Sequence, residues 1–195
     1  MTPSFEQACA AIDAANAQDP RRVTWQGQSH PQELLYAQRM VAWARQLKPD
    51  ASEELLLAVR AQHVQRWKIP RSSYPMDRKG YLLWREALKV MHAEMLVVIM
   101  KQAGYSDEAT QKAVQLIRRK QMATDPEGQV LEDAACLVFL QYEYADFAAK
   151  TVDDKVVDIL RKTWKKMSPA AHAEALKLTY GAREGALVQK ALGLI

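Results

Sequence analysis

The 195-residue sequence has few of the features that crosslink or anchor a chain. Its 2 cysteines, Cys9 and Cys136, lie in apolar contexts typical of helices, which favours buried thiols and a reducing compartment over a disulfide framework. The longest apolar runs, such as MLVVIM at 95–100, are far too short to span a bilayer. The N-terminus carries acidic residues and lacks the basic start of a signal peptide. These absences predict a cytoplasmic protein with no membrane partner.

Glycine (7 residues) and proline (8 residues) are also scarce, and they fall mostly between segments of helical periodicity. Ser4 with Gln7 and Asp50 with Glu53 resemble capping boxes at helix starts. The predicted helices cover about 4–17, 31–47, 51–67, a segment from Gly80 to 103, 106–120, 130–148, 152–166, a segment from Pro169 onward, and 183–193. No repeat or linker interrupts them, so we expect one all-α domain over residues 1–195, with about eight or nine helices.

Positive charge is concentrated in one part of the chain. The whole sequence carries a formal net charge of +4, whereas residues 60–90 alone hold 8 basic and 2 acidic side chains. A concentrated basic patch favours an anionic partner, although a solvated helix face is the alternative explanation.

The segment RAQHVQRWKIPRSSYP (60–75) places one histidine inside this basic stretch. Within the predicted helix 51–67, Arg60, His63 and Trp67 are spaced so that they share one face. Pro70 and Pro75, with residues 76–81, predict a loop over the end of that helix.

Arginine binds phosphate or carboxylate through two parallel hydrogen bonds, and aromatic rings stack on a base or cover a site. We therefore expect a pocket for a phosphorylated small molecule or nucleotide. The expected substrate-binding residues are Arg60, Arg71, Tyr74, Arg78, Trp84, Arg85 and Lys120. In the alternative, Trp67 and Trp84 are core residues, and the arginines pair with Glu33, Glu86, Glu94 or Glu132.

The chain resembles the HD-domain superfamily over about residues 31–145. The resemblance is carried by three segments: the first ends in RAQHVQRW, the second begins with HAEMLVVIM, and the third is LEDAACLVFL. That superfamily is a helical fold of metal-dependent phosphohydrolases and some oxygenases. The resemblance implies an HD-like bundle in which His63, His92 and Asp133 are ligands. Tyr36 and Val64 stand where the family has a histidine and an aspartate, so two of its usual four ligands are missing.

The three remaining ligands imply an open site for one divalent transition metal. Such a metal would lower the pKa of a bound water, with Glu132 as general base and Arg66 neutralising phosphate charge beside His63. The alternative is a fold that has lost the metal and kept the cleft.

Longer motifs resemble an uncharacterised family of bacterial and fungal proteins, known as a domain of unknown function. They are P-x-E-L-x-Y, RAQH-x-x-RW-x-x-PR-x-x-YP, R-x-GYL-x-WR and LEDAACLVFL. Some members of that family carry the label glutamyl-tRNA synthetase. The present sequence gives that label no support, because it has no P-loop, no glycine-rich dinucleotide motif and no zinc-ribbon cysteines.

Three functions stay open at the level of sequence. The first is a metal-dependent hydrolase of a phosphorylated small molecule or nucleotide. The second is a metal-free enzyme or binding module for an anionic metabolite, with His63 as an acid or base near neutral pH. The third is a protein or RNA adaptor that uses a second basic patch at Arg161, Lys162, Lys165 and Lys166; the modest net charge disfavours RNA. The sequence predicts no particular oligomeric state.

Overall fold

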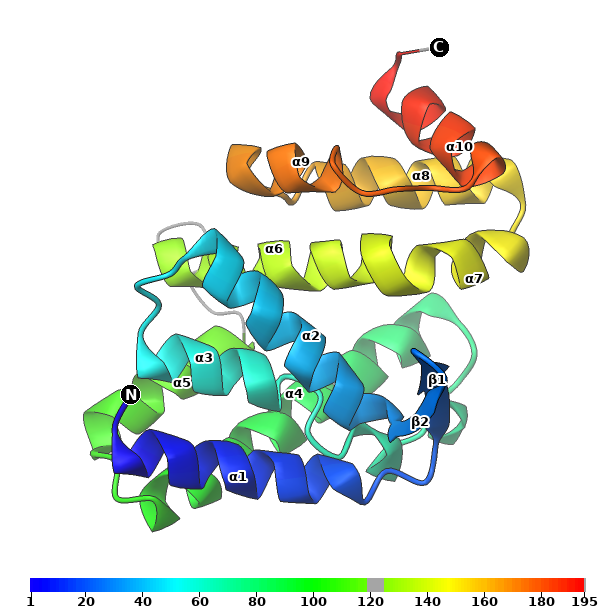
Figure 1. Ribbon diagram of the computed structural model, residues 1–195. Helices are drawn as coiled ribbons and strands as arrows, with labels where there is room; N and C mark the ends of the chain where they lie inside the picture. Colours follow the sequence, from blue (N-terminus) through cyan, green and yellow to red (C-terminus); the bar gives the residue numbers. More distant parts are fainter. Residues whose placement is uncertain (119–124, 195) are drawn as a thin grey trace. The chain divides into compact units, whose positions relative to one another are not determined.

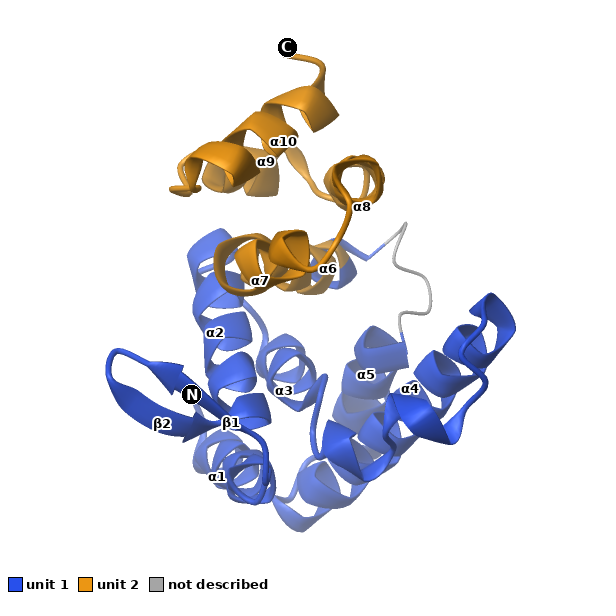
Figure 2. Cartoon of the chain, turned by 90° about the vertical axis from the view of Figure 1, so that its right-hand side faces the viewer, with its two compact units in different colours: residues 1–128 blue, residues 129–195 orange. Residues whose placement is uncertain are grey.

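The computed structural model describes residues 1–118 and 125–194 and confirms the all-α class (Figure 1). Its contacts divide the chain into two compact units, residues 1–128 and 129–195 (Figure 2). A single domain and an HD-like arrangement stay predictions. Within the described residues, no helix combines the length and apolar character needed to cross a bilayer.

Helices build most of the first unit. They are α1 (Pro3–Ala17), α2 (Gln32–Leu47), α3 (Glu53–Ala61), α4 (Arg78–Gln102), α5 (Asp107–Arg118) and the start of α6 (Pro126–Val138), with short 3-10 turns at Arg66–Lys68 and Arg71–Ser73. Helix α3 contacts α1, α2, α4 and α5. Its residues from Leu55 to Val59 are all buried, as expected of a helix that is apolar on every side.

The two predicted capping boxes are displaced by two residues from the observed caps. Thr2, rather than Ser4, caps α1 by accepting a hydrogen bond from the Phe5 amide. Ser52, rather than Asp50, caps α3 by accepting from the Leu55 amide. In both cases the extended backbone of the observed cap aims its hydroxyl at the third amide of the helix.

A β-hairpin precedes α2, and sequence analysis missed it. Strand β1 (Arg22–Trp25) pairs with strand β2 (Gln28–Pro31) in antiparallel register. The two-residue turn uses Gln26 and Gly27, both with positive φ, which is the geometry of a tight hairpin. The strands are too short and too exposed to show a period-two apolar pattern.

The predicted helix 51–67 ends early, at Ala61. Gln65 adopts the left-handed conformation with φ of 50°, which stops the helix. The buried Asn16 side chain of α1 accepts a hydrogen bond from the Gln65 amide at 3.0 Å. The prediction that Arg60, His63 and Trp67 share a helix face is therefore wrong, and His63 lies in a turn.

Helix α4 begins at Arg78, before the predicted start at Gly80, because Asp77 caps it and accepts from the Gly80 amide. The loop after α3 consequently ends near residue 77 and does not extend to Tyr81. Gly80 is buried against Pro75, and a Cβ atom at position 80 would lie 2.1 Å from the Pro75 carbonyl oxygen. Only glycine allows this close approach.

The second unit consists of the rest of α6, a π-helical turn (Phe139–Glu143), α7 (Tyr144–Ala149), α8 (Asp153–Trp164), α9 (Pro169–Ala175) and α10 (Ala182–Leu192). The predicted helix 130–148 is thus interrupted by a π-helical turn. Helix α10 packs on α8. Ser168 caps α9 directly before Pro169, as the sequence predicts.

Candidate functional site

A pocket of about 90 Å³ lies in the first unit. Its lining comes from the turn after α3, one face of α4 and the end of α5: Gln62, His63, Arg66, Tyr81, Trp84, Arg85, Leu88, Lys89, His92 and Ile117. The six residues from α4 follow helical spacing, so one stripe of that helix forms a wall. This stripe runs from Tyr81, which is 42% exposed, to His92, which is 3% exposed.

The pocket is cationic. Arg66, Arg85 and Lys89 line it together with His63, and none of its lining residues is an aspartate or glutamate. Lys89 forms an ion pair at 3.2 Å with Glu86, whose side chain is largely exposed. This pair offsets part of the charge of Lys89, while Arg66 and Arg85 supply the rest of the positive potential.

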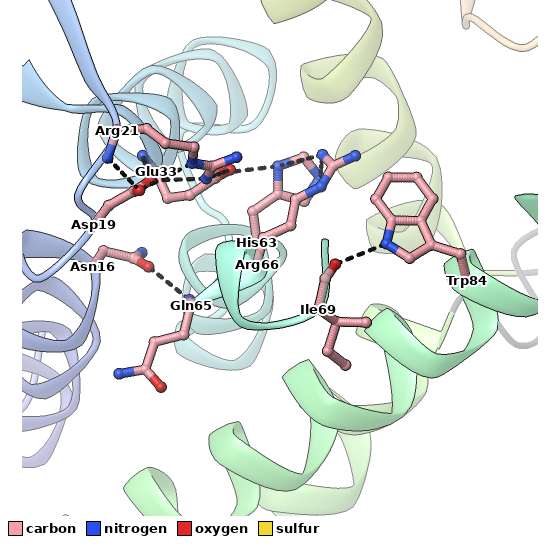
Figure 3. Close-up of polar contacts among 9 residues, drawn as sticks. All are labelled: Asn16, Asp19, Arg21, Glu33, His63, Gln65, Arg66, Ile69 and Trp84. Carbon is pink, nitrogen blue, oxygen red and sulfur yellow. Dashed lines mark hydrogen bonds and ion pairs between the residues drawn. The ribbon is translucent and has the colours of Figure 1, made fainter. Parts of the chain in front are cut away.

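His63 is fixed on two sides. Its Nδ1 lies 3.2 Å from Oε2 of Glu33 (Figure 3), and its ring stacks on Tyr36 with centroids 4.1 Å apart. Burial alone would raise the pKa of Glu33. The hydrogen bond from His63, the positive charges of His63 and Arg66, and the bond from Arg21 instead hold that pKa below its usual value. The ionised Glu33 thereby fixes the orientation of the His63 ring.

Glu33 is in turn held by hydrogen bonds with the buried Asp19 and the partly exposed Arg21 (Figure 3). Arg21 donates from Nη2 to Glu33 Oε1 at 2.6 Å, and it binds Asp19 through Nε and Nη2 at 3.0 and 2.8 Å. The Glu33 amide donates to Asp19 at 3.1 Å. Because the β1–β2 hairpin spans residues 22–31, it returns the chain so that Arg21 and Glu33 meet.

Arg66 contacts both rings beside it. Its Nη1 lies 3.0 Å from Nε2 and 3.2 Å from Nδ1 of His63, and its guanidinium carbon lies 5.0 Å from the centre of the Trp84 ring. The Trp84 indole donates to the Ile69 carbonyl at 2.8 Å, as Figure 3 shows, which fixes the ring. These contacts hold Arg66 at the pocket. No carboxylate of the described residues bonds directly to its guanidinium group.

Two buried polar atoms at the pocket have no hydrogen-bond partner among the described residues: Oε1 of Gln62 and Nε2 of His92. Burial, followed by the charges of His63 and Arg66, lowers the pKa of His92 to about 3, so its imidazole is neutral. The rings of His63 and His92 have centroids 6.1 Å apart. An unsatisfied buried polar atom costs about 1–3 kcal/mol, and a bound ligand can supply the missing partner.

The structure brings five of the predicted site residues together at this pocket: His63, Arg66, Trp84, Arg85 and His92. Four other expected residues do not line it. Arg60 pairs with Asp13 of α1, Arg71 donates to the carbonyls of the loop after α3, and Tyr74 and Arg78 lie away from the lining. Lys120 lies outside the described residues.

The remaining predicted residues belong to the second unit. Asp133 accepts from the amide and the hydroxyl of Ser168 at 2.8 and 2.6 Å, and from Gln129 at 2.9 Å. It therefore supports the cap of α9. Glu132 forms an ion pair with Lys166 at 3.6 Å.

Partners within each unit occupy two of the three candidate metal ligands, His63 in the first unit and Asp133 in the second. A guanidinium nitrogen lies beside both ring nitrogens of His63, and both oxygens of Asp133 accept hydrogen bonds from Ser168. Among residues 1–118 and 125–194, no group of three or more His, Cys, Asp or Glu side chains has metal-binding geometry. A metal held by His63, His92 and Asp133 stays a prediction, which elemental analysis of the purified protein tests.

Sequence analysis missed the roles of Asp19, Arg21 and Glu33. A glutamate in the first turn of a helix is ordinarily explained by the helix dipole, so Glu33 carried no separate signal. The P-x-E-L-x-Y motif, which contains both Glu33 and Tyr36, is the one feature that could have pointed to His63.

Comparisons with known proteins identify a family without assigning an activity. No curated protein matches the chain, and no solved structure does. One family model, described as a domain of unknown function (DUF4202), matches residues 6–188. This match covers the pocket, the Glu33 network and nearly all of the second unit, and so the chain belongs to that family.

Proposed function

We propose that the first unit binds a phosphorylated small molecule in the pocket between α3, α4 and α5, and that it does so without a metal. The observation that supports this most directly is the pocket lining, which has Arg66, Arg85 and Lys89 and no carboxylate. Anionic groups bind most strongly to such clusters where apolar walls lower the local dielectric constant. Trp84, Leu88 and Ile117 provide those walls.

The size of the pocket favours a small metabolite over a nucleotide. Pockets for drug-sized ligands measure about 300–1,000 Å³, and the volume here is about 90 Å³. The tests below also distinguish the RNA adaptor and the metal-dependent hydrolase, because each of these functions predicts a different change in binding or metal content for the same variants.

A chemical role for His63 is the second candidate, and the Glu33 contact favours it. A carboxylate on Nδ1 orients the ring for general acid–base catalysis through Nε2, which takes or gives a proton once a bound phosphate engages Arg66 in its place. In this candidate Glu33, Arg21 and Asp19 position the base, and Arg66 and Arg85 hold the phosphate of the substrate.

Calorimetric titration of the full chain with inorganic phosphate and a series of phosphomonoesters tests the binding proposal. Arg66→Ala and Arg85→Ala should each weaken binding at least 10-fold, since each removes one charge-assisted contact worth about 1.5–3 kcal/mol. Arg78→Ala is the matched control, because Arg78 is an exposed arginine that lies on α4, like Arg85, but does not line the pocket. We expect it to change affinity less than 2-fold.

Three results would overturn the proposal. One is the absence of binding by every phosphorylated compound. Another is an equal loss in Arg78→Ala and Arg66→Ala, which would indicate only a diffuse surface charge of the kind that RNA detects. The third is a transition metal near one per chain that is lost in His63→Ala, which would favour the metal-dependent hydrolase.

A further inference from the structure

The pocket has a buried neutral end as well as a cationic one. Gln62 comes from the turn after α3 and His92 from the middle of α4, yet both line the same pocket and both are more than nine-tenths buried. Each leaves one polar atom without a partner in the described residues, Oε1 of Gln62 and Nε2 of His92. Two such atoms at one place indicate a specific missing group.

We infer that the phosphorylated ligand also carries a hydroxyl group, which Gln62 and His92 recognise at the buried end of the pocket. This inference rests on the proposed binding of a phosphorylated molecule, and it narrows the ligand to phosphomonoesters of small hydroxylated compounds such as polyols.

A phosphate group cannot be the partner of these two atoms. The amide oxygen of Gln62 only accepts hydrogen bonds, and a phosphate dianion has no proton to donate. The neutral imidazole of His92 contributes no charge to attract an anion. The phosphate therefore belongs with Arg66, Arg85 and Lys89.

A hydroxyl satisfies both atoms. It donates one hydrogen bond and accepts others, so one hydroxyl can donate to the Gln62 oxygen and accept from a protonated His92 Nε2, whereas a bare Nε2 is matched by the second hydroxyl of a polyol. The same match holds if the Gln62 amide is turned over, because the hydroxyl then accepts from the amide nitrogen.

The spacing of the two ends suits a short ligand. Arg66 Nη1 lies 3.0 Å from His63 Nε2, and the His63 and His92 ring centroids are 6.1 Å apart. Arg85 and His92 lie two helical turns apart along one stripe of α4, a rise of about 10 Å. A phosphorylated chain of a few carbon atoms spans such a distance, with its hydroxyl toward Leu88 and His92.

Calorimetry with matched probes tests the inference. The probes are glycerol 3-phosphate, propyl phosphate, which has the same carbon chain without hydroxyls, and inorganic phosphate. Sites built to bind a hydroxyl discriminate strongly against analogues that lack it. We expect glycerol 3-phosphate to bind the wild-type chain at least 10-fold more tightly than propyl phosphate or inorganic phosphate.

Gln62→Met and His92→Leu are the decisive variants. Each should remove most of that preference while leaving the affinity for propyl phosphate within about 3-fold of wild type. Gln62→Met should leave the melting temperature near that of wild type, because the oxygen that it removes has no hydrogen-bond partner in the described residues. His92→Leu also removes the hydrogen bond between the imidazole and the Gln62 backbone, so its readout is the lost preference rather than the melting temperature. A merely structural role of these side chains would lower the melting temperature and leave the preference intact.

The failure of this inference is distinguishable from that of the proposed function. If propyl phosphate or inorganic phosphate binds as well as glycerol 3-phosphate, and Arg66→Ala weakens all three, the hydroxyl is not recognised but the anion site stands. If the preference survives in both Gln62→Met and His92→Leu, the hydroxyl is bound elsewhere and the inference is overturned. If none of the probes binds, both the inference and the anion site fail.

Discussion

Two buried carboxylates, Glu33 in the first unit and Asp133 in the second, meet different partners. Glu33 contacts the side chains of His63 and Arg21, while Asp133 accepts from the amide and hydroxyl of Ser168 at the start of α9. The first carboxylate orients a group that lines a pocket, and the second supports a helix cap. The donors around a carboxylate, rather than its burial, therefore decide whether it serves a site or the fold.

Glu33→Gln should have the largest effect on stability. The amide cannot be ionised, and it leaves the partly buried Arg21 and His63 with a weaker acceptor. The loss should approach about 3 kcal/mol of the free energy of unfolding, the upper end of the range for hydrogen bonds to a charged group. Urea denaturation at neutral pH measures this loss. A variant as stable as wild type would show that Asp19 alone holds Arg21, and that Glu33 is dispensable.

The contribution of Glu33 should also disappear in acid. Its pKa is lower in the folded protein than the ordinary value of 4.5, so its stabilising effect is fully present above about pH 4.5. The effect is lost as the pH falls through the lowered pKa. The difference in free energy of unfolding between wild type and Glu33→Gln should consequently shrink below pH 4.5. A difference that stays constant down to pH 2 would contradict the ionised state of Glu33.

Asp133→Ala should destabilise the chain by about 2 kcal/mol, because it leaves the half-buried amide and hydroxyl donors of Ser168 without their acceptor. It should leave the affinity for inorganic phosphate unchanged, in contrast to Glu33→Gln, which releases His63. Parallel denaturation and calorimetry on the two variants measure both quantities. Loss of phosphate binding in a folded Asp133→Ala protein would contradict this prediction and would indicate that Asp133 takes part in binding.

Ser168→Ala should have the smallest effect, a loss of about 1 kcal/mol, which is typical of a removed helix cap. The hydroxyl accepts from the Ala171 amide and donates to Asp133, so both bonds are lost together. In a double-mutant cycle with Asp133→Ala, the two losses should not add. Additive losses would mean that the two residues stabilise α9 independently.

Much of the site was predictable because its residues share a local pattern. Of the residues that sequence analysis assigned to the site, His63, Arg66, Arg85 and His92 line one pocket, because they lie within the basic stretch 60–90 or directly after it. The all-α class followed from periodicity in the same way. The role assigned to Asp133 as a metal ligand rested on a family resemblance. Its hydrogen-bond partner in the structure, Ser168, lies 35 residues later in the sequence.

The features that sequence analysis missed depend on contacts between distant segments. No signal near Gln65 predicts that Asn16, 49 residues earlier, ends the third helix. The hairpin is short and exposed, so its strands lack an apolar face, and the pairing of Arg21 with Glu33 exists only once that hairpin has formed. Tertiary context decided each of these points against the local helical preference.

The bond between Asn16 and Gln65 also ties the turn that carries His63 to α1. The left-handed turn that carries His63 is held by a side chain of α1, and the Gln65 amide has no other acceptor in the described residues. That amide hydrogen is shielded from solvent until α1 detaches from the turn. Its hydrogen exchange should therefore be as slow as that of the α3 core, and it should report the cooperative opening of the first unit.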